Sequence, residues 1–225
     1  MTVLVGCSHG TDNTDGRAAI RTILADVRRL RPELDVREAF VDVQIPEVAA
    51  VVADAVAGGG TAVVVPLLLS VGFHVRVDIA EAVDREGASA APPLGPDPRL
   101  VAMLVDRLEA VGLQPDDAVV LAAAGSTDPA AAIAVEAVAA GLADAIENPV
   151  TIGYGAGASP TVPAAVTDAR AALSPGGRVV VAAYLLAPGY FHDRVLEAGA
   201  DVVTDALAPD LRLAAIVLDR FDDAR

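Results

Sequence analysis

Short apolar runs alternate with amphipathic stretches along the whole chain. The predicted strands are rich in Val and other apolar residues and span residues 3–5, 36–43, 61–69, 118–124, 150–154 and 179–186. The predicted helices share apolar residues three or four positions apart and span residues 17–30, 48–56, 75–83, 100–111, 130–143, 162–173 and 211–221. This alternation predicts right-handed βαβ units, and therefore parallel sheets flanked by helices.

The second half of the chain repeats the first. Residues 96–107 share several identical residues with residues 209–220. Further matching pairs of residues lie 113–118 positions apart in the sequence. In this comparison Gly125 takes the place of His9. We therefore predict a duplicated α/β domain, with one lobe at residues 1–113 and a second lobe at residues 114–225 that is a degenerate copy.

Composition excludes several classes of function. The net charge of −15 argues against nucleic acid or an anionic membrane as the partner. All 16 basic residues are Arg, so a Schiff-base Lys and a phosphate-binding P-loop Lys are both excluded. The Gly-rich stretch at 153–157 lacks the spacing of a dinucleotide loop, and we expect no nucleotide. Neither a signal peptide nor a membrane span is visible, which favours a cytoplasmic protein.

Two of the three histidines follow predicted strands. His9 comes directly after the first strand, His74 after the third, and Asp42 lies at the end of the second. If the strand order is 2-1-3-4, these residues meet at the edge where open α/β sheets bind ligands. Two imidazoles and a carboxylate suit Fe²⁺ or Co²⁺, and few protein ligands leave positions open for exchange. The alternative is that His9 caps the next helix and His74 is a hydrogen-bonded loop residue.

The remaining histidine and the single cysteine are weaker candidates. His192 has no partner histidine in its own half, so we expect a solvated or core residue. Cys7 could be a nucleophile beside His9, but a cysteine at a strand end is more often a small buried hydrophobe.

Several motifs together resemble one enzyme family. The segments that carry the resemblance are residues 8–11 (Ser-His-Gly-Thr), 40–42 before Pro46, 66–69, 72–79 (Gly-x-His-x-x-x-Asp-Ile), 93–96 and 186–194. They are similar to the class II tetrapyrrole chelatases, and in particular to the two-repeat form of the sirohydrochlorin ferrochelatase and cobaltochelatase branch. The resemblance implies a lyase of two similar α/β lobes, with the active site in the cleft between them.

The resemblance also assigns residues. It implies that His9 and His74 bind the metal and that Asp42 is the active-site carboxylate, which is usually Glu in the family. We expect substrate contacts from Ser8, Gly10, Thr11, Ser70 and Arg76. The chain departs from the family pattern at Asp12, where Arg is frequent, and at Ile45, where an acid is frequent.

The implied substrates are a divalent metal and sirohydrochlorin or a related tetrapyrrole. We expect Fe²⁺ for sirohaem biosynthesis, with Co²⁺ for cobalamin biosynthesis or Ni²⁺ as alternatives. Because sirohydrochlorin is a polycarboxylate and the protein is acidic, Arg17 and Arg76 are candidate anchors. A non-catalytic metal or tetrapyrrole carrier would use the same histidines. A histidine phosphatase would need Arg-His-Gly, and Ser8 precedes the histidine here. A duplicated chain can act as a monomer or a homodimer.

Overall fold

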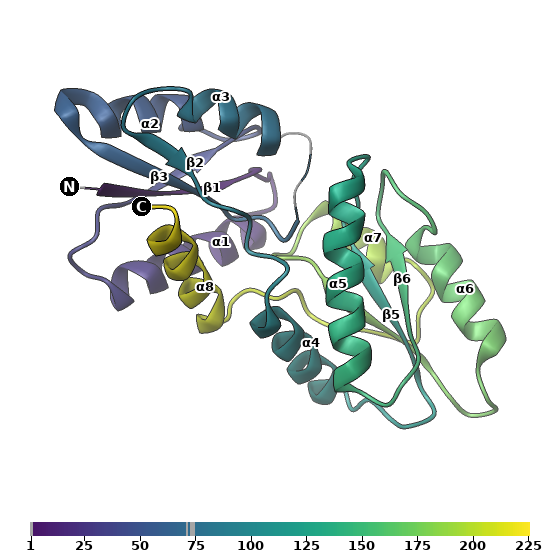
Figure 1. Ribbon diagram of the computed structural model, residues 1–225. Coiled ribbons are helices and arrows are strands. Elements are labelled where there is room, and N and C mark those ends of the chain that lie inside the picture. Colours follow the sequence, from purple (N-terminus) through teal and green to yellow (C-terminus); the bar gives the residue numbers. More distant parts are fainter. Residues whose placement is uncertain (1, 71, 73–74) are drawn as a thin grey trace. The chain divides into compact units, whose positions relative to one another are not determined.

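The computed structural model describes residues 2–70, 72 and 75–225, with the backbone alone at 75 and 76. The chain forms two compact α/β units (Figure 1). Unit 1 comprises Met1–Leu94 and Ala208–Arg225, and unit 2 comprises Gly95–Leu207. The predicted fold class, parallel sheets flanked by helices, is confirmed in both units.

Unit 1 contains a four-stranded parallel sheet in the order β2-β1-β3-β4, which is the order that the expected convergence of His9, His74 and Asp42 requires. Its strands are β1 (Thr2–Ser8), β2 (Val36–Phe40), β3 (Thr61–Pro66) and β4 (Ala88–Ala90). Its helices are α1 (Thr14–Leu30), α2 (Val48–Val56), the short 3₁₀ helix η1 (Ala57–Gly59), the π-helix η2 (Val75–Ile79), α3 (Ala80–Val83) and α8 (Leu211–Asp223).

Both faces of this sheet are covered, as the nearly continuous apolar sequences of its central strands require. Helices α2 and α3 pack on one face, around a core that includes Val5, Val52 and Val64. Helices α1 and α8 pack against each other on the opposite face, where α8 contacts β3 (Figure 1). The loops at the strand ends are therefore the part of unit 1 that is open to ligands.

Unit 2 repeats this architecture with the order β6-β5-β7-β8. Its strands are β5 (Ala118–Ala123), β6 (Val150–Tyr154), β7 (Val179–Tyr184) and β8 (Val202–Val203). Its helices are α4 (Pro98–Ala110), α5 (Pro129–Ala145), α6 (Val162–Ala172) and α7 (Tyr190–Leu196). Helices α6 and α7 pack on one face, and α4 and α5 lie on the other.

The two repeats exchange their last helices, so the compact units differ from the predicted lobes at 1–113 and 114–225. Helix α4 belongs to the first repeat but packs in unit 2, where Arg107 donates to the carbonyls of Ala206 and Leu207 (3.3 and 3.1 Å). Helix α8 belongs to the second repeat but packs in unit 1, where Arg220 donates to the carbonyls of Pro93 and Leu94 (3.0 and 3.1 Å). The boundary at 113 divides the sequence repeats rather than the compact units.

Most predicted elements are present, with shifted ends. Strand β2 ends at Phe40 rather than at Val43, and β4, β8 and α7 were not predicted. Helix α1 begins at Thr14 because the Asn13 side chain accepts from the Gly16 N–H and caps it. No helix in the described part of the chain is long and apolar enough to cross a membrane.

Candidate active site

Three parallel strands of the first sheet end side by side. Ser8, the last residue of β1, pairs with Phe40 at the end of β2, and β3 ends on the other side of β1. The segments that follow these strands leave the sheet at one edge, which is where open parallel sheets bind ligands. On two of these segments, His9 and Asp42 are the first residues whose side chains can bind a metal ion or a proton.

Backbone hydrogen bonds hold the loops after β1 and β2 against each other. The Val41 N–H donates to the Ser8 carbonyl (3.0 Å), and the Asp42 N–H donates to the His9 carbonyl (3.1 Å). These bonds extend the β1–β2 ladder beyond the strands and make His9 and Asp42 neighbours. Both residues are exposed at this edge, where a ligand from solvent reaches them.

Gly10 permits this close approach. Its φ of 93° lies in the left-handed region. A Cβ at this position would come closer than 3.0 Å to the Asp42 carbonyl oxygen and to 3.2 Å from the Val43 Cβ. Only glycine combines this backbone conformation with the missing side chain. Gly10, predicted to contact substrate, therefore has a steric role that brings the His9 loop onto the Asp42 loop.

Side chains fix the Asp42 loop. The Val43 N–H donates to Asp42 Oδ1 (2.7 Å), and the Thr11 N–H donates to Gln44 Oε1 (3.0 Å). Val43 has a φ of 59°, which a β-branched residue rarely adopts. Such strain persists where the surrounding contacts impose it. The roles of Val43 and Gln44 were not predicted, because residues 36–43 were expected to form a strand throughout.

Thr11 links the site to helix α1. Its hydroxyl accepts from the Asn13 N–H (3.1 Å), and the Asn13 side chain in turn accepts from the Gly16 N–H (2.8 Å). Asn13 is therefore the N-cap of α1, and the alternative in which His9 caps this helix is wrong. A contact between Thr11 and the substrate stays a prediction.

Arg17 places a positive charge beside this loop. Its Nε donates to the Thr11 carbonyl (2.6 Å), and its Nη2 lies 3.0 Å from Asp12 Oδ1. The Asp12 side chain is 91 % exposed, so water and salt screen this ion pair strongly. The Arg17 guanidinium can therefore exchange Asp12 for another carboxylate at low energetic cost.

The other predicted site residues lie partly beyond what the structure describes. His74 is outside the described residues, and for Arg76, in η2, only the backbone is described. Ser70 is half-buried after β3, and Ser8 is 5 % exposed. Within the described ranges, no three His, Cys, Asp or Glu side chains form a group that could hold a metal ion. The pairing of His9 with His74 stays a prediction.

Cys7 is a core residue rather than a nucleophile. Its side chain is fully buried among the apolar residues that pack under α2. Burial, and secondarily the negative charge of Asp78, raise the pKa of the Cys7 thiol to about 12. The thiol is therefore neutral at physiological pH, which confirms the interpretation of Cys7 as a small buried hydrophobe.

The corresponding edge of the second sheet has the same backbone. Gly125 has a φ of 84°, close to that of Gly10. A Cβ on Gly125 would overlap the carbonyl oxygen of Ala156, as one on Gly10 would overlap that of Asp42. Ala156 therefore stands in unit 2 where Asp42 stands in unit 1.

The match of Gly125 to Gly10 corrects the expected alignment of the two repeats. Because Gly125 is the counterpart of Gly10, the residue in the place of His9 is Ala124, and the expectation of Gly125 there is wrong by one residue. A chain rich in Ala and Val offers few distinctive residues to fix a register from sequence. With alanine at both positions, this edge of unit 2 offers neither the imidazole nor the carboxylate found in unit 1.

An aromatic ring packs into this edge of unit 2. Phe191 lies against Gly155, where a Cβ would come within 2.9 Å of its ring, and it packs edge-to-face on Tyr190. The neighbouring His192 Nε2 lies 3.1 Å from the Thr204 carbonyl oxygen, so the ring donates a hydrogen bond there. The His192 side chain is half-buried, and its expected place outside the metal site stays a prediction.

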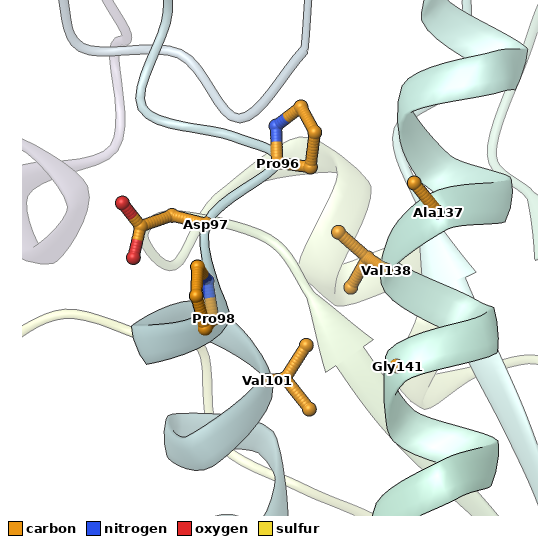
Figure 2. A pocket seen from close by; sticks show the side chains of 7 residues that line it. All are labelled: Pro96, Asp97, Pro98, Val101, Ala137, Val138 and Gly141. Atoms are coloured by element: carbon orange, nitrogen blue, oxygen red, sulfur yellow. The ribbon is translucent and has the colours of Figure 1, made fainter.

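Unit 2 has a cavity of about 440 Å³ between α4 and α5. Figure 2 shows the residues that line it: Pro96, Asp97, Pro98, Val101, Ala137, Val138 and Gly141. The Asp97 carboxylate points away from α5 in this view and is bound by the Arg99 guanidinium (2.8 Å for each of two N–H donors). The lining is otherwise apolar and offers no group for acid–base or metal chemistry.

The sequence matches the model of the CbiX family over residues 3–111 and again over residues 118–224. This chain belongs to the CbiX family. Each match covers one sequence repeat, although the compact units exchange their last helices. A search of curated proteins gives no significant match.

Solved structures share the fold of this CbiX-family chain. SirB from Bacillus subtilis with Fe³⁺ aligns with a TM-score of 0.84 at 20% identity, over 99% of this chain and 94% of that one. The sirohydrochlorin chelatase SirB from Bacillus subtilis subspecies spizizenii, in complex with cobalt, gives 0.79 at 19% identity with the same coverage. CbiX, named as the terminal enzyme for biosynthesis of siroheme in denitrifying bacteria, gives 0.69 at 20% identity over 99% of both chains. At these identities the likeness shows the fold alone.

Proposed function

We propose that this CbiX-family protein is a sirohydrochlorin chelatase, a lyase-class enzyme that inserts a divalent metal, Fe²⁺ first of all, into the tetrapyrrole. The observation that supports the proposal most directly is the pair of exposed donors His9 and Asp42, held together at the carboxyl edge of the first sheet. Two structural neighbours are SirB with Fe³⁺ and SirB in complex with cobalt, and a third, CbiX, is the terminal enzyme for biosynthesis of siroheme in denitrifying bacteria.

In this proposal His9, together with His74, binds the incoming metal ion. Imidazole binds a metal only in its neutral form, so protons compete with the metal ion for the ring nitrogen. We therefore expect insertion to slow as the pH falls. The second sheet has alanine in the place of His9, so we expect one metal site per chain.

Insertion also releases protons. When a divalent ion enters the ring, two pyrrole N–H bonds break, the nitrogen lone pairs bind the metal and two protons leave. Asp42 is the base that the structure supports, because its carboxylate is exposed beside His9. Its Oδ1 accepts from the Val43 N–H, which orients the carboxylate and directs Oδ2 to the proton.

Arg17 can bind a carboxylate of the macrocycle in place of Asp12. We expect Arg17→Gln to raise the KM for sirohydrochlorin about tenfold with little change in kcat, since one charge-assisted hydrogen bond contributes ~1.5 kcal/mol. Arg21→Gln is the matched control, because Arg21 lies one turn further along α1 and is 3.6 Å from Glu38. An equal rise of KM in both variants would contradict a specific role for Arg17.

Cobalt is the second metal to test, because one of the structural neighbours is in complex with it. The same N and O donors accept Fe²⁺, Co²⁺ and Ni²⁺, with affinity that rises in this order. Insertion of Co²⁺ faster than Fe²⁺ at equal free concentrations would favour the cobaltochelatase of cobalamin biosynthesis. Binding of metal without insertion would favour a carrier.

The test is a multiple-turnover assay under anaerobic conditions. Sirohydrochlorin and Fe²⁺ or Co²⁺ are mixed with protein at about one hundredth of the tetrapyrrole concentration, and the absorbance of the metallated ring is followed. We expect many equivalents of product per chain, at a rate proportional to protein concentration. Product that stops at one equivalent per chain, or a rate equal to that without protein, would overturn the proposal.

A further inference from the structure

The loop between β2 and α2 exposes two aliphatic side chains at the candidate active site. Val43 is 50 % exposed and Ile45 is 85 % exposed. Turn-forming loops usually carry Gly, Pro, Asn, Asp or Ser, because these residues fit the backbone or bond to it. Ligand sites, in contrast, combine apolar side chains with a few placed polar groups. Val43 directly follows Asp42 and Ile45 lies two residues further along the same loop, so the loop offers such a combination.

The Val43 side chain lies directly beside the histidine loop. A Cβ on Gly10, the residue after His9, would stand only 3.2 Å from the Val43 Cβ. The aliphatic group therefore begins within contact distance of the backbone that carries the imidazole. A molecule that reaches a metal on His9 also comes to lie beside Val43.

Val43 keeps this position in spite of an unfavourable backbone conformation. At a φ of 59°, Gly or Asn would be less strained than a β-branched residue. The loop is held by the bond from the Val43 N–H to Asp42 Oδ1 (2.7 Å) and by Gln44 Oε1, which accepts from the Thr11 N–H (3.0 Å). A turn without further function would gain stability from Asn or Gly at this position. The isopropyl group, half-exposed in spite of this strain, points to a contact with a molecule outside the chain.

We propose that Val43 and Ile45 form an apolar surface on which one face of the tetrapyrrole lies while His9 presents the metal to its centre. The inference rests on the proposed function and names the residues that recognise the ring. A tetrapyrrole is flat and apolar on its faces and carries its carboxylates at the rim. Such a ligand needs an aliphatic surface beside the metal donor, and cations such as Arg17 further out.

The Val43–Ile45 surface sets the affinity for the macrocycle and leaves the affinity for the metal unchanged. Val43→Asn removes the aliphatic group and fits the left-handed conformation, so the variant folds at least as well as the native chain. Ile45→Gln replaces an exposed aliphatic side chain by a polar one of similar length. Leu30→Gln is the matched control, because Leu30 is 43 % exposed at the end of α1, which begins at the active-site edge and runs away from it.

The experiment measures the binding of metal-free sirohydrochlorin by fluorescence, and the steady-state insertion of Co²⁺. We expect Val43→Asn and Ile45→Gln each to raise the Kd for the ring about threefold and the double variant about tenfold, equivalent to ~1.4 kcal/mol. We expect KM to rise with Kd while kcat and the Kd for Co²⁺ alone stay within twofold, because the lost contact is the same in the ground and transition states. Leu30→Gln should match the native protein.

Failure of this inference differs from failure of the proposed function. If the native protein metallates sirohydrochlorin and the double variant binds the ring within twofold of the native Kd, the inference is wrong and the proposed function stands. A Leu30→Gln variant as weak as the double variant would also overturn it. If the native protein neither binds nor metallates the ring, both are wrong.

Discussion

Substitution of Gly10 by alanine disturbs the contact between the His9 and Asp42 loops. The added Cβ meets two obstacles at once. Gly10 has a φ of 93°, which costs an L-residue ~1–2 kcal/mol, and the Cβ would come closer than 3.0 Å to the Asp42 carbonyl oxygen. Overpacking of this kind typically costs ~1–3 kcal/mol. We therefore expect Gly10→Ala to lower the free energy of unfolding by ~3 kcal/mol.

The effect on activity follows from the displacement of the Asp42 loop. The Asp42 carbonyl must move by roughly 1 Å to restore the ~3.3 Å of a close C–H···O contact. A misplacement of this size near reacting groups reduces the rate by ~10²-fold, equivalent to ~2.7 kcal/mol in the activation free energy. We expect this loss in the kcat/KM for Co²⁺ insertion by Gly10→Ala.

The chain contains two matched controls. Gly125→Ala creates the same strain and the same overlap with a backbone carbonyl, but in the loop of unit 2 that carries Ala124 and Ala156. Gly58→Ala creates the strain alone, since its φ is 71° and nothing lies within 4 Å of the added Cβ. We expect Gly125→Ala to lose as much stability as Gly10→Ala and Gly58→Ala to lose ~1 kcal/mol. In both control variants, the kcat/KM for Co²⁺ insertion should stay within threefold of the native value.

Stability is measured by chemical denaturation with circular dichroism, and activity by the absorbance assay at a temperature where every variant is folded. The reasoning is refuted if Gly10→Ala inserts metal within threefold of the native rate. It is refuted equally if Gly125→Ala loses as much activity as Gly10→Ala, because the loss would then follow general destabilisation.

Three further predictions use other parts of the molecule. Burial raises the pKa of the Cys7 thiol to about 12. We therefore expect mass spectrometry to show no alkylation of the folded protein by iodoacetamide at pH 8, and rapid alkylation in denaturant. Alkylation of Cys7 at equal rates in the two conditions would contradict its buried position. Asp117 is 2 % exposed, and hydrogen bonds from the Arg178 guanidinium lower the pKa of its carboxyl. Because the Arg178 side chain is 34 % exposed, solvent screens the pair, and we expect Asp117→Asn to cost ~1 kcal/mol at pH 7. The native ion pair stabilises the fold fully above the unfolded Asp pKa of ~3.9 and loses this contribution as the pH falls through the lower pKa of the folded state. The difference in free energy of unfolding between the native protein and Asp117→Asn should therefore shrink at low pH. An unchanged difference at pH 2 would contradict this linkage. Equilibrium dialysis should give one Co²⁺ per native chain, whereas two would contradict the absence of donors at Ala124 and Ala156.

Much of the fold is predictable from the chain, for identifiable reasons. The β-branched runs of the central strands and the spaced apolar residues of α1 and α8 leave little choice of element. Strands β4 and β8 were missed because they have three and two residues, and Ala88–Ala90 lacks the β-branched residues that indicate a strand. Helix α7 was missed because it is short and has no side-chain cap. The exchange of α4 and α8 depends on tertiary packing, which no local pattern contains.

The site residues could be predicted where a metal-binding or acid–base side chain directly follows a predicted strand. The convergence of His9 and Asp42 was predicted on the condition that the strand order is 2-1-3-4, and the sheet has this order. The left-handed conformation of Val43 could not be inferred, because Val is among the residues least suited to it. The Gln44–Thr11 bond joins residues 33 positions apart and depends on that turn. Gly125 rather than Ala124 was expected at the position that corresponds to His9, because no distinctive side chain marks the loop in the second repeat.

The central claim is that His9, with His74, delivers the metal to the tetrapyrrole. The chain has three histidines, so one set of single substitutions tests it completely. We would measure the initial rate of Co²⁺ insertion into sirohydrochlorin for His9→Ala, His74→Ala and His192→Ala beside the native protein, with each fold checked by circular dichroism. The account predicts that the first two variants lose at least ~10²-fold and that His192→Ala, which loses only a bond to the Thr204 carbonyl, stays within threefold of native. A His9→Ala variant that inserts metal at the native rate, or a His192→Ala variant that loses as much as His9→Ala while still folded, would contradict it.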